Sequence, residues 1–420
     1  MKVYKFGGAS INSIDRIKNV GNIIASSQGE KLLIIISAMG KTTNALEKVA
    51  EAFFSGRKDD ALNLFQTIKQ QHLDTLKYLT VTGWQAAENH LKDFFTEVEW
   101  LLHDKPVRQY DYYYDQIVCS GELMSTAMVS HYLNERGIRN TWLDVRDIIR
   151  TDDNFRDAGI DWDYTSQRIG EDVQNAFRQT DIIITQGFIG STDENESTTL
   201  GREGSDYSAA IFANLLPGES VTIWKDVEAV MSADPKKYPD ASIIPALSFL
   251  EVIEMAYYGA QVIHPKTIKP LQNKNIPLYV KSFIDPSLPG TSISGMNPRN
   301  LPPIIVDKPG QVLITFRSRD FSFVEDKPVE ELHQVFHQIR IKPNVSQNTA
   351  ISLLCCFDDH PEKIDQLASA ASEIFDVELE RNLRLLTIRH YTEDSIDQLT
   401  AGKTIVLEQK TPQTVQIIMR

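Results

Sequence analysis

Residues 31–44 read KLLIIISAMGKTTN, and this stretch decides the fold class. The run of apolar residues at 32–36 is followed at once by small and hydroxyl-bearing residues. A helical pattern of apolar residues comes next, at Leu46, Val49, Ala50 and Phe53. A strand that is apolar throughout is typical of a parallel sheet covered on both faces. The stretch therefore predicts a buried parallel strand, a short loop at its carboxyl end and a covering helix.

The same pattern recurs along the first 300 residues. Other apolar, strand-like runs are VYKF (3–6), TDIIITQGF (180–188), SVTIW (220–224) and IPLYVKSF (276–283). Helical patterns alternate with them, which predicts an α/β fold with a mostly parallel central sheet and right-handed crossovers. Residues 42–104 break the alternation, since they are almost entirely helical in pattern. We expect a helical insertion there.

A second domain is predicted after a change in composition. Residues 286–303, PSLPGTSISGMNPRNLPP, are rich in Pro, Gly, Ser and Asn, as linkers are. Beyond them the strand and helix patterns follow the order β-α-β-β-α-β of the ferredoxin-like unit, and a second copy begins but stops before its second helix. We therefore predict one domain over 1–296 and an α+β ferredoxin-like module over 304–420, with its second unit truncated.

Composition excludes several classes of protein. The 420 residues carry 43 Lys and Arg against 57 Asp and Glu, a net charge of −14, which disfavours a nucleic-acid or anionic-membrane surface. No apolar run approaches the roughly 18–20 residues of a membrane span, and MKVYKFGGAS at the start has too few apolar residues for a signal peptide. Three cysteines do not suit a disulfide framework or a zinc cluster. We expect a soluble, cytoplasmic protein.

Four loops that connect a strand to a helix carry the candidate chemistry. Ligands of open α/β sheets bind at the carboxyl ends of strands, where free N–H groups and helix dipoles face anions. The first loop is Lys5-Phe6-Gly7-Gly8-Ala9-Ser10, which is also compatible with an ordinary tight turn. The second, 37–44, holds hydroxyl groups that either bind an anion or only cap a helix. The third is Ser120-Gly121-Glu122, whose glutamate by itself would merely complement a helix dipole.

The fourth loop is the most specific. Residues 198–208 read TTLGREGSDYS, with Arg202 between glycines and Asp206 in the first turn of the predicted helix. Arginine suits bidentate recognition of a carboxylate or phosphate, and we expect Ser205 to be the N-cap. Stability alone does not explain an Arg and an Asp in a glycine loop at the ligand edge. The residues show no metal-ligand spacing and no Ser–His–Asp triad, and His264 before a proline is more typical of a packed histidine.

Taken in this order, the loops resemble motifs of the aspartate kinases of the amino-acid kinase family. Lys5–Ser10 resembles K-F-G-G-[TS]-S, 37–44 resembles S-A-x-x-G-x-T-N, and 199–206 resembles T-L-G-R-G-G-S-D. Residues 120–122, 226–234 and 259–265 resemble three further motifs, and the tail is similar to paired ACT regulatory modules. The resemblance implies the three-layer amino-acid-kinase sandwich with a C-terminal ACT module.

The resemblance also implies roles for individual residues. Catalysis would depend on Lys5, at the transferred phosphoryl group, and on Asp206, which would organise Lys5 and the Mg-nucleotide. Aspartate would be held by Ser37, Thr43, Glu122 and Arg202, with Glu122 at the ammonium and Arg202 at a carboxylate. ATP would contact Lys5, Phe6, Gly7, Gly8, Lys225, Asp226, Met231, Lys236 and Gln261.

Several positions depart from the family pattern. Gln261 stands where the family has a lysine near the phosphates, and Glu203 replaces a glycine. Lys225, Met231 and Lys236 replace the usual threonine, tyrosine and arginine. The motif at 120–122 has lost one residue. These departures change residues that would contact the adenine and the phosphates of ATP. The truncated second ACT unit changes the region on which the family's dimer geometry and feedback depend.

The activity implied is phosphorylation of the β-carboxylate of L-aspartate by ATP with Mg²⁺, the first step of lysine, threonine and methionine biosynthesis, without a tightly bound protein metal. A carboxylate is already a nucleophile near neutral pH, so the reaction requires positioning and charge neutralisation rather than a general base. The partners implied are aspartate, MgATP, a second copy of the chain, and an amino-acid effector near 342–352, where Asn344 and Gln347 offer amides. Two alternatives remain: another acid kinase of this fold, acting on glutamate, acetylglutamate or a nucleotide, and a non-catalytic amino-acid sensor.

Overall fold

The computed structural model describes residues 1–319 and 327–420, which form two compact units. The first unit comprises Met1–Val230, Ile243–Ala256 and Gln261–Pro298. The second comprises Met231–Ser242, Tyr257–Ala260 and Arg299–Arg420. Two short segments from the first 300 residues therefore belong to the C-terminal unit. The catalytic and regulatory roles expected of the two parts stay predictions.

A central sheet of eight strands organises the first unit, in the order β3-β4-β2-β1-β7-β9-β10-β8. Every neighbouring pair is parallel except β9 with β10. The strands are β1 (Lys2–Phe6), β2 (Leu32–Ile36), β3 (Thr141–Trp142), β4 (Ile182–Gln186), β7 (Ser220–Lys225), β8 (Ala246–Ser248), β9 (Leu278–Ser282) and β10 (Thr291–Ser294). All five residues of β2 and of β4 are buried, because layers cover both faces of the sheet. The predicted parallel α/β sheet is confirmed.

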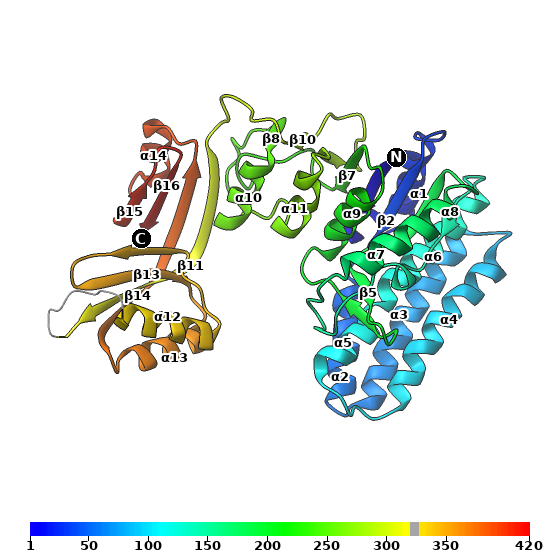
Figure 1. The fold of residues 1–420 in the computed structure, drawn as a ribbon, viewed down its shortest axis with the longest axis horizontal. Helices are drawn as coiled ribbons and strands as arrows, with labels where there is room; N and C mark the ends of the chain where they lie inside the picture. The colour runs from blue at the N-terminus through cyan, green and yellow to red at the C-terminus, as the bar shows by residue number, and fades with distance from the viewer. Residues whose placement is uncertain (320–326) are drawn as a thin grey trace. The chain divides into compact units, whose positions relative to one another are not determined.

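Helices surround this sheet, and a small hairpin of β5 (Ile189–Ser191) and β6 (Ser197–Thr199) lies apart from it. The helices that begin in the first unit are α1 (Ile14–Ala25), α2 (Thr42–Phe54), α3 (Lys58–Leu79), α4 (Trp84–His103), α5 (Tyr110–Val118), α6 (Ser120–Glu135), α7 (Trp162–Arg168), α8 (Gln174–Ala176), α9 (Gly204–Leu215), α10 (Phe249–Tyr258) and α11 (Pro265–Asn273), with short non-α turns at Gly8–Ile11, Val145–Asp147 and Ile169–Val173. Helices α2 to α5 gather at one end of the unit, below the label of β2 in Figure 1. None of the helices in 1–319 or 327–420 is both long and apolar enough to cross a membrane.

The second unit is built on one antiparallel sheet in the order β12-β13-β11-β14-β16-β15. Its elements are β11 (Ile304–Ser318), α12 (Lys327–Ile339), β12 (Val345–Asn348), β13 (Ser352–Asp358), α13 (Pro361–Ala371), β14 (Phe375–Arg389), α14 (Glu393–Thr400), β15 (Ile405–Lys410) and β16 (Thr414–Met419). Helices α12 and α13 cover one end of this sheet through a core that includes Phe316, Phe336 and Leu367. The order of elements confirms the ferredoxin-like, ACT-like fold.

The long strand β11 serves both repeats of this unit. Its second half, Gln311–Arg317, pairs with β13 of the first repeat. Its first half, from Ile304 to Lys308, pairs with the part of β14 whose other side pairs with β16. This first half takes the place of the fourth strand that the truncated repeat lacks. The second repeat therefore has a four-stranded sheet although its own sequence supplies three strands.

Candidate active site

The candidate site begins where three neighbouring parallel strands end. Phe6 of β1 is in register with Ile36 of β2 on one side and with Trp224 of β7 on the other. Because the three strands are parallel, the loops after them leave the sheet at the same edge. The predicted loops that start at Gly7 and Ser37 therefore lie together with the end of β7.

A buried ion pair joins two of the predicted catalytic residues. The Lys5 ammonium lies 2.5 Å from Oδ1 of Asp206, and the two side chains are 13% and 4% exposed. Asp206 is in the first turn of α9, as expected, so the helix N-terminus also faces its negative charge. A buried ion pair of this kind fixes the position of the lysine at this edge of the sheet.

Close backbone contact explains the paired glycines. A Cβ atom on Gly8 would lie 2.7 Å from the carbonyl oxygen of Ala38 and 2.8 Å from that of Gly40. The Gly40 amide donates to the Gly8 carbonyl at 3.1 Å, and Gly40 has a φ of +59°. Glycine is required at position 8 because any side chain would separate the two loops.

Glu122 is the most unusual side chain of the site. It lies in the first turn of α6, and its Oε1 accepts a 3.3 Å hydrogen bond from the Ala38 amide. Its Oε2 is buried and has no hydrogen-bond partner in the described part of the chain. Burial raises the pKa of Glu122 to about 8, although the nearby Lys5 charge partly opposes the shift. A cationic group placed at Oε2 would restore the charged carboxylate and satisfy its free oxygen.

The other predicted substrate residues differ in how they are held. Ser37 donates to the Ser205 hydroxyl at 3.0 Å. The side chain of Thr43 is half-buried and that of Arg202 is exposed, and neither makes a side-chain hydrogen bond or ion pair within 1–319 and 327–420. The expected N-cap at Ser205 is wrong, because α9 begins at Gly204 with Glu203 in the N-cap position. Ser205 instead faces the loop after β2, through its bond with Ser37.

The predicted nucleotide residues are divided between the two units. Phe6 is fully buried and stacks on Trp224 at a centroid distance of 5.9 Å. The Lys225 ammonium donates to the Val262 carbonyl at 2.6 Å, which brings β7 to the loop that holds the exposed Gln261. Asp226 is exposed in the first unit. The two remaining residues, the half-buried Met231 and the exposed Lys236, belong to the second unit.

Glu203, which departs from the family's glycine, has a structural use. It adopts a left-handed φ of +56°, a conformation that costs a non-glycine residue roughly 1 kcal/mol. Its Oε2 accepts a 2.8 Å hydrogen bond from the His264 amide. Glu203 thereby ties the start of α9 to the loop before α11.

Two residues that the sequence motifs did not indicate also support the site. Asp115 of α5 accepts hydrogen bonds from the Thr199 amide at 2.8 Å, the Thr199 hydroxyl at 2.7 Å and the Arg156 amide at 2.9 Å. Gly187 follows β4, and a Cβ there would lie 2.7 Å from the Cα of Ser205. Gly187 could have been found as a small residue after a buried strand. Asp115 could not, because it lies inside a helix and its partners are far away in the sequence.

The part of the chain that the structure describes contains no group of three or more His, Cys, Asp or Glu side chains arranged to hold a metal ion. Asp206 offers carboxylate oxygens, but it is already paired with Lys5. Carboxylate oxygens such as these are among the donors that Mg²⁺ prefers.

Comparison with known proteins agrees with this geometry. The sequence model of the amino acid kinase family matches residues 1–282. The chain belongs to the amino acid kinase family. Lysine-sensitive aspartokinase 3 of Escherichia coli (strain K12) is 33% identical over 320 residues, which are 75% of this chain and 69% of that protein. Within the family, the chain therefore belongs with the aspartokinases.

Longer relatives match the same part of this family member. A bifunctional aspartokinase/homoserine dehydrogenase 2 of Arabidopsis thaliana is 35% identical over 295 residues, which are 69% of this chain and 32% of that protein. The chain thus spans about a third of the length of these bifunctional relatives.

Solved structures extend the likeness over the whole chain. The structure of E. coli aspartokinase III in complex with aspartate and ADP has a TM-score of 0.82 at 25% identity, and the match covers 100% of this chain and 96% of that one. The structure of the same enzyme with lysine and aspartate gives the same TM-score and covers 95% of that chain. The amino acid kinase fold with a C-terminal antiparallel module is thereby confirmed.

Proposed function

We propose that this chain transfers the γ-phosphoryl group of ATP to the β-carboxylate of L-aspartate and forms 4-phospho-L-aspartate. The observation that carries the proposal is the buried, unsatisfied Oε2 of Glu122 beside the Lys5–Asp206 pair. The Glu122 carboxyl can bind a cation, and the Lys5 ammonium can bind an anion. An amino acid that carries an ammonium and accepts a phosphoryl group matches both.

Each side chain has a defined task in this proposal. Glu122 binds the substrate ammonium, and Arg202 binds a substrate carboxylate through its planar donors. Lys5 neutralises charge on the transferred phosphoryl group, and Asp206 holds Lys5 in place and faces the magnesium that ATP brings. The attacking carboxylate needs no general base, so the reaction depends on alignment of two anions.

Ser37 lies in the loop after β2 that contacts Gly8, and Thr43 lies in the first turn of α2, which follows this loop; both positions support their proposed place at the substrate. Phe6, Gly7, Gly8, Lys225, Asp226, Met231, Lys236 and Gln261 remain the proposed ATP contacts. The relative whose structure contains aspartate and ADP supports both substrates.

The alternatives are separated by the ammonium. N-acetylglutamate has no ammonium and would leave the Glu122 carboxyl unsatisfied, whereas glutamate differs from aspartate only in length. Gln261, which removes one positive charge from the family pattern, is the observation that keeps a non-catalytic sensor as the second candidate.

The test is an acceptor panel with the full chain, ATP and Mg²⁺, in which acyl phosphate is trapped by hydroxylamine as the hydroxamate. We expect hydroxamate with L-aspartate, much less with L-glutamate, and none with N-acetylglutamate or without an acceptor. A folded chain that binds aspartate but forms neither hydroxamate nor ADP is a sensor, and one that prefers glutamate is a different acid kinase.

We also propose a role for the second unit, a cellular location and a place in metabolism. We place the second unit, over 304–420, in regulation and homodimer formation, with an amino-acid effector near 342–352. The lysine-bound structure of E. coli aspartokinase III supports an effector of that class. We propose a cytoplasmic location and a place in the synthesis of lysine, threonine and methionine.

A further inference from the structure

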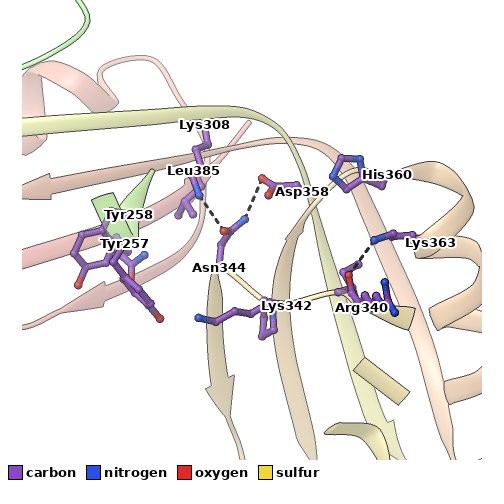
Figure 2. Close-up of a pocket in the computed structure, with 13 residues that line it drawn as sticks. Tyr257, Tyr258, Lys308, Arg340, Lys342, Asn344, Asp358, His360, Lys363 and Leu385 are labelled. Atoms are coloured by element: carbon purple, nitrogen blue, oxygen red, sulfur yellow. Dashed lines mark hydrogen bonds between the residues drawn. The ribbon is translucent and has the colours of Figure 1, made fainter. Parts of the chain in front are cut away.

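A cavity of about 290 Å³ lies in the second unit, and none of the residues assigned to catalysis lines it. It is formed where β13 ends, α13 begins, and the connection from α12 to β12 turns (Figure 2). All of its lining residues belong to the second unit: Tyr257, Tyr258, Lys308, Arg340, Ile341, Lys342, Pro343, Asn344, Asp358, His360, Lys363, Leu385 and Gln416.

The wall of this cavity is positively charged. Lys308, Arg340, Lys342 and Lys363 line it, against the single carboxylate of Asp358. None of the four cations forms an ion pair with a carboxylate in 1–319 or 327–420, although neighbouring basic residues such as Arg381 and Arg384 do. The wall is thus locally positive although the whole chain has a net charge of −14. Like charges that converge on one cavity repel each other, and an anion between them removes that cost.

Neutral groups hold three of these cations in place. The Lys308 ammonium donates to Oδ1 of Asn344 at 3.0 Å, and the Lys363 ammonium donates to the Arg340 carbonyl at 3.0 Å (Figure 2). The Lys342 ammonium lies 5.0 Å from the centroid of the Tyr257 ring. Carbonyl, amide and ring partners orient an ammonium but leave its full charge for a ligand.

The one carboxylate of the wall is already occupied. Oδ1 of Asp358 accepts hydrogen bonds from the side-chain amide of Gln311 at 2.8 Å and from that of Asn344 at 3.2 Å. Asn344 therefore lies between Asp358 and Lys308 and keeps them apart. Asp358 and Lys308 therefore form no direct ion pair.

Helix α13 adds to the positive potential. It has 11 residues, begins at Pro361, and its N-cap residue His360 makes no side-chain capping bond. Both His360 and Lys363 of its first turn line the cavity. The partial positive charge of a helix N-terminus thus adds to that of the four side chains.

We propose that this cavity is a binding site for a compact polyanion, a phosphate ester or polycarboxylate with at least two negative charges. Lys308 and Lys342 approach the ligand from the side of Tyr257, and Arg340 and Lys363 from the side of α13. A lysine effector near 342–352 would have to bind outside this cavity, because its cationic side chain would add to the four existing positive charges. The site is independent of the proposed kinase activity, since no catalytic residue takes part.

The test uses titration calorimetry of the full chain with inorganic pyrophosphate and, separately, with citrate, in the absence of nucleotide. We expect the double variant Lys308→Met, Lys342→Met to bind the preferred anion at least about tenfold more weakly, because each lost charge-assisted hydrogen bond alone has roughly that effect. Lys342→Met alone, at an exposed position, guards against a folding defect in the double variant and is expected to weaken binding in the same direction. Preference for pyrophosphate or for citrate identifies the phosphate or the polycarboxylate class.

Two controls locate the binding event. Lys403→Met removes an exposed lysine of the same unit that does not line the cavity, and its affinity should equal that of the parent. Lys5→Met alters the proposed ATP site in the other unit. Citrate should bind this variant with the parental affinity, and binding of pyrophosphate to the cavity should still be measured. Hydrogen exchange with saturating anion should slow at 340–344 and 358–364. Absence of binding by both anions, or equal affinity of the parent and the double variant, would overturn the proposal.

Discussion

At the scale of the residue, the buried carboxyl of Glu122 shows how one side chain can specify a substrate. Its pKa is raised to about 8 by burial, so it holds a proton at neutral pH in the chain without substrate. An ammonium at the free Oε2 would favour the charged form and release that proton. Substrate binding and proton release are therefore coupled at this residue.

The raised pKa predicts how stability depends on pH. Between about pH 5 and pH 8 the native state keeps a proton that the unfolded state loses, so the contribution of Glu122 is complete at low pH and disappears as pH rises through 8. Glu122→Gln should therefore lack this decline, and the parent should become less stable relative to the variant by on the order of a few kcal/mol over that range. Denaturant unfolding at several pH values measures it, with the exposed Glu228→Gln as control. Parallel pH profiles for the parent and Glu122→Gln would contradict the raised pKa.

Lys5 tests the role of the buried ion pair in the proposed reaction. Because charge on the transferred group is stabilised mainly in the transition state, Lys5→Ala should lower kcat by about 100-fold or more and change ATP affinity far less. Steady-state kinetics and nucleotide-binding measurements separate the two effects. Lys2→Ala, on the same strand but paired with the surface Glu30, should be nearly silent. Parental turnover by a folded Lys5→Ala chain would refute the role.

Arg202 tests substrate recognition. Its side chain is exposed and has no partner in the described residues, so its removal should disturb the fold little. Arg202→Ala should raise the aspartate KM and lose about 2–5 kcal/mol in kcat/KM, because a substrate carboxylate would lose its cation. The exposed Arg139→Ala serves as the matched control. If Arg202→Ala has parental aspartate kinetics, another residue binds the carboxylate.

At the scale of the element, helix α5 positions the loop that carries Arg202. Asp115 binds both the amide and the hydroxyl of Thr199 at the end of β6, three residues before Arg202. Its burial raises its pKa to about 6, which the three hydrogen bonds to it oppose. The helix therefore acts on the site through the backbone of this loop rather than by contact with substrate.

Removal of the Asp115 carboxylate should loosen that loop. Asp115→Ala would leave the buried Thr199 N–H without its acceptor, at a cost of roughly 1–3 kcal/mol, and would also remove the acceptor of the partly buried Arg156 N–H. We expect a lower melting temperature and a raised aspartate KM. The affinity for ATP should fall less than the affinity for aspartate. The control is Asp111→Ala, which lies on α5 like Asp115 and removes only a surface ion-pair partner of Arg156. A variant with lower stability but parental KM would show that Asp115 supports the fold alone.

At the scale of the whole molecule, the two units use strand pairing in different ways. The first has a mostly parallel sheet, and the proposed catalytic loops lie together at the ends of its central strands. The second has one antiparallel sheet in which β11 completes both repeats. The truncated repeat thus has a complete four-stranded sheet, which supports its proposed role in assembly and regulation.

Light scattering and calorimetry test that role. We expect a dimer in light scattering, and heat of binding for at least one of lysine, threonine and methionine, with a matching change in aspartate affinity because coupling between two sites is reciprocal. Binding without any change in aspartate affinity would remove regulation. A monomer would remove the assembly role.

The sequence by itself determined the types of elements and indicated the candidate site residues, whose roles stay predictions. The apolar run at 32–36, the helical spacing after it and the loop TTLGREGSDYS are local patterns, and the periodicity of side chains along a strand or helix is a local property. Tertiary structure alone decided the burial and free oxygen of Glu122, the support of Thr199 by Asp115, and the convergence of unpaired cations on the cavity at Lys308. It also decided that Ile304–Lys308 would complete the last repeat. These features join residues that are far apart in the chain, so they depend on which elements pack together, and no local pattern records that.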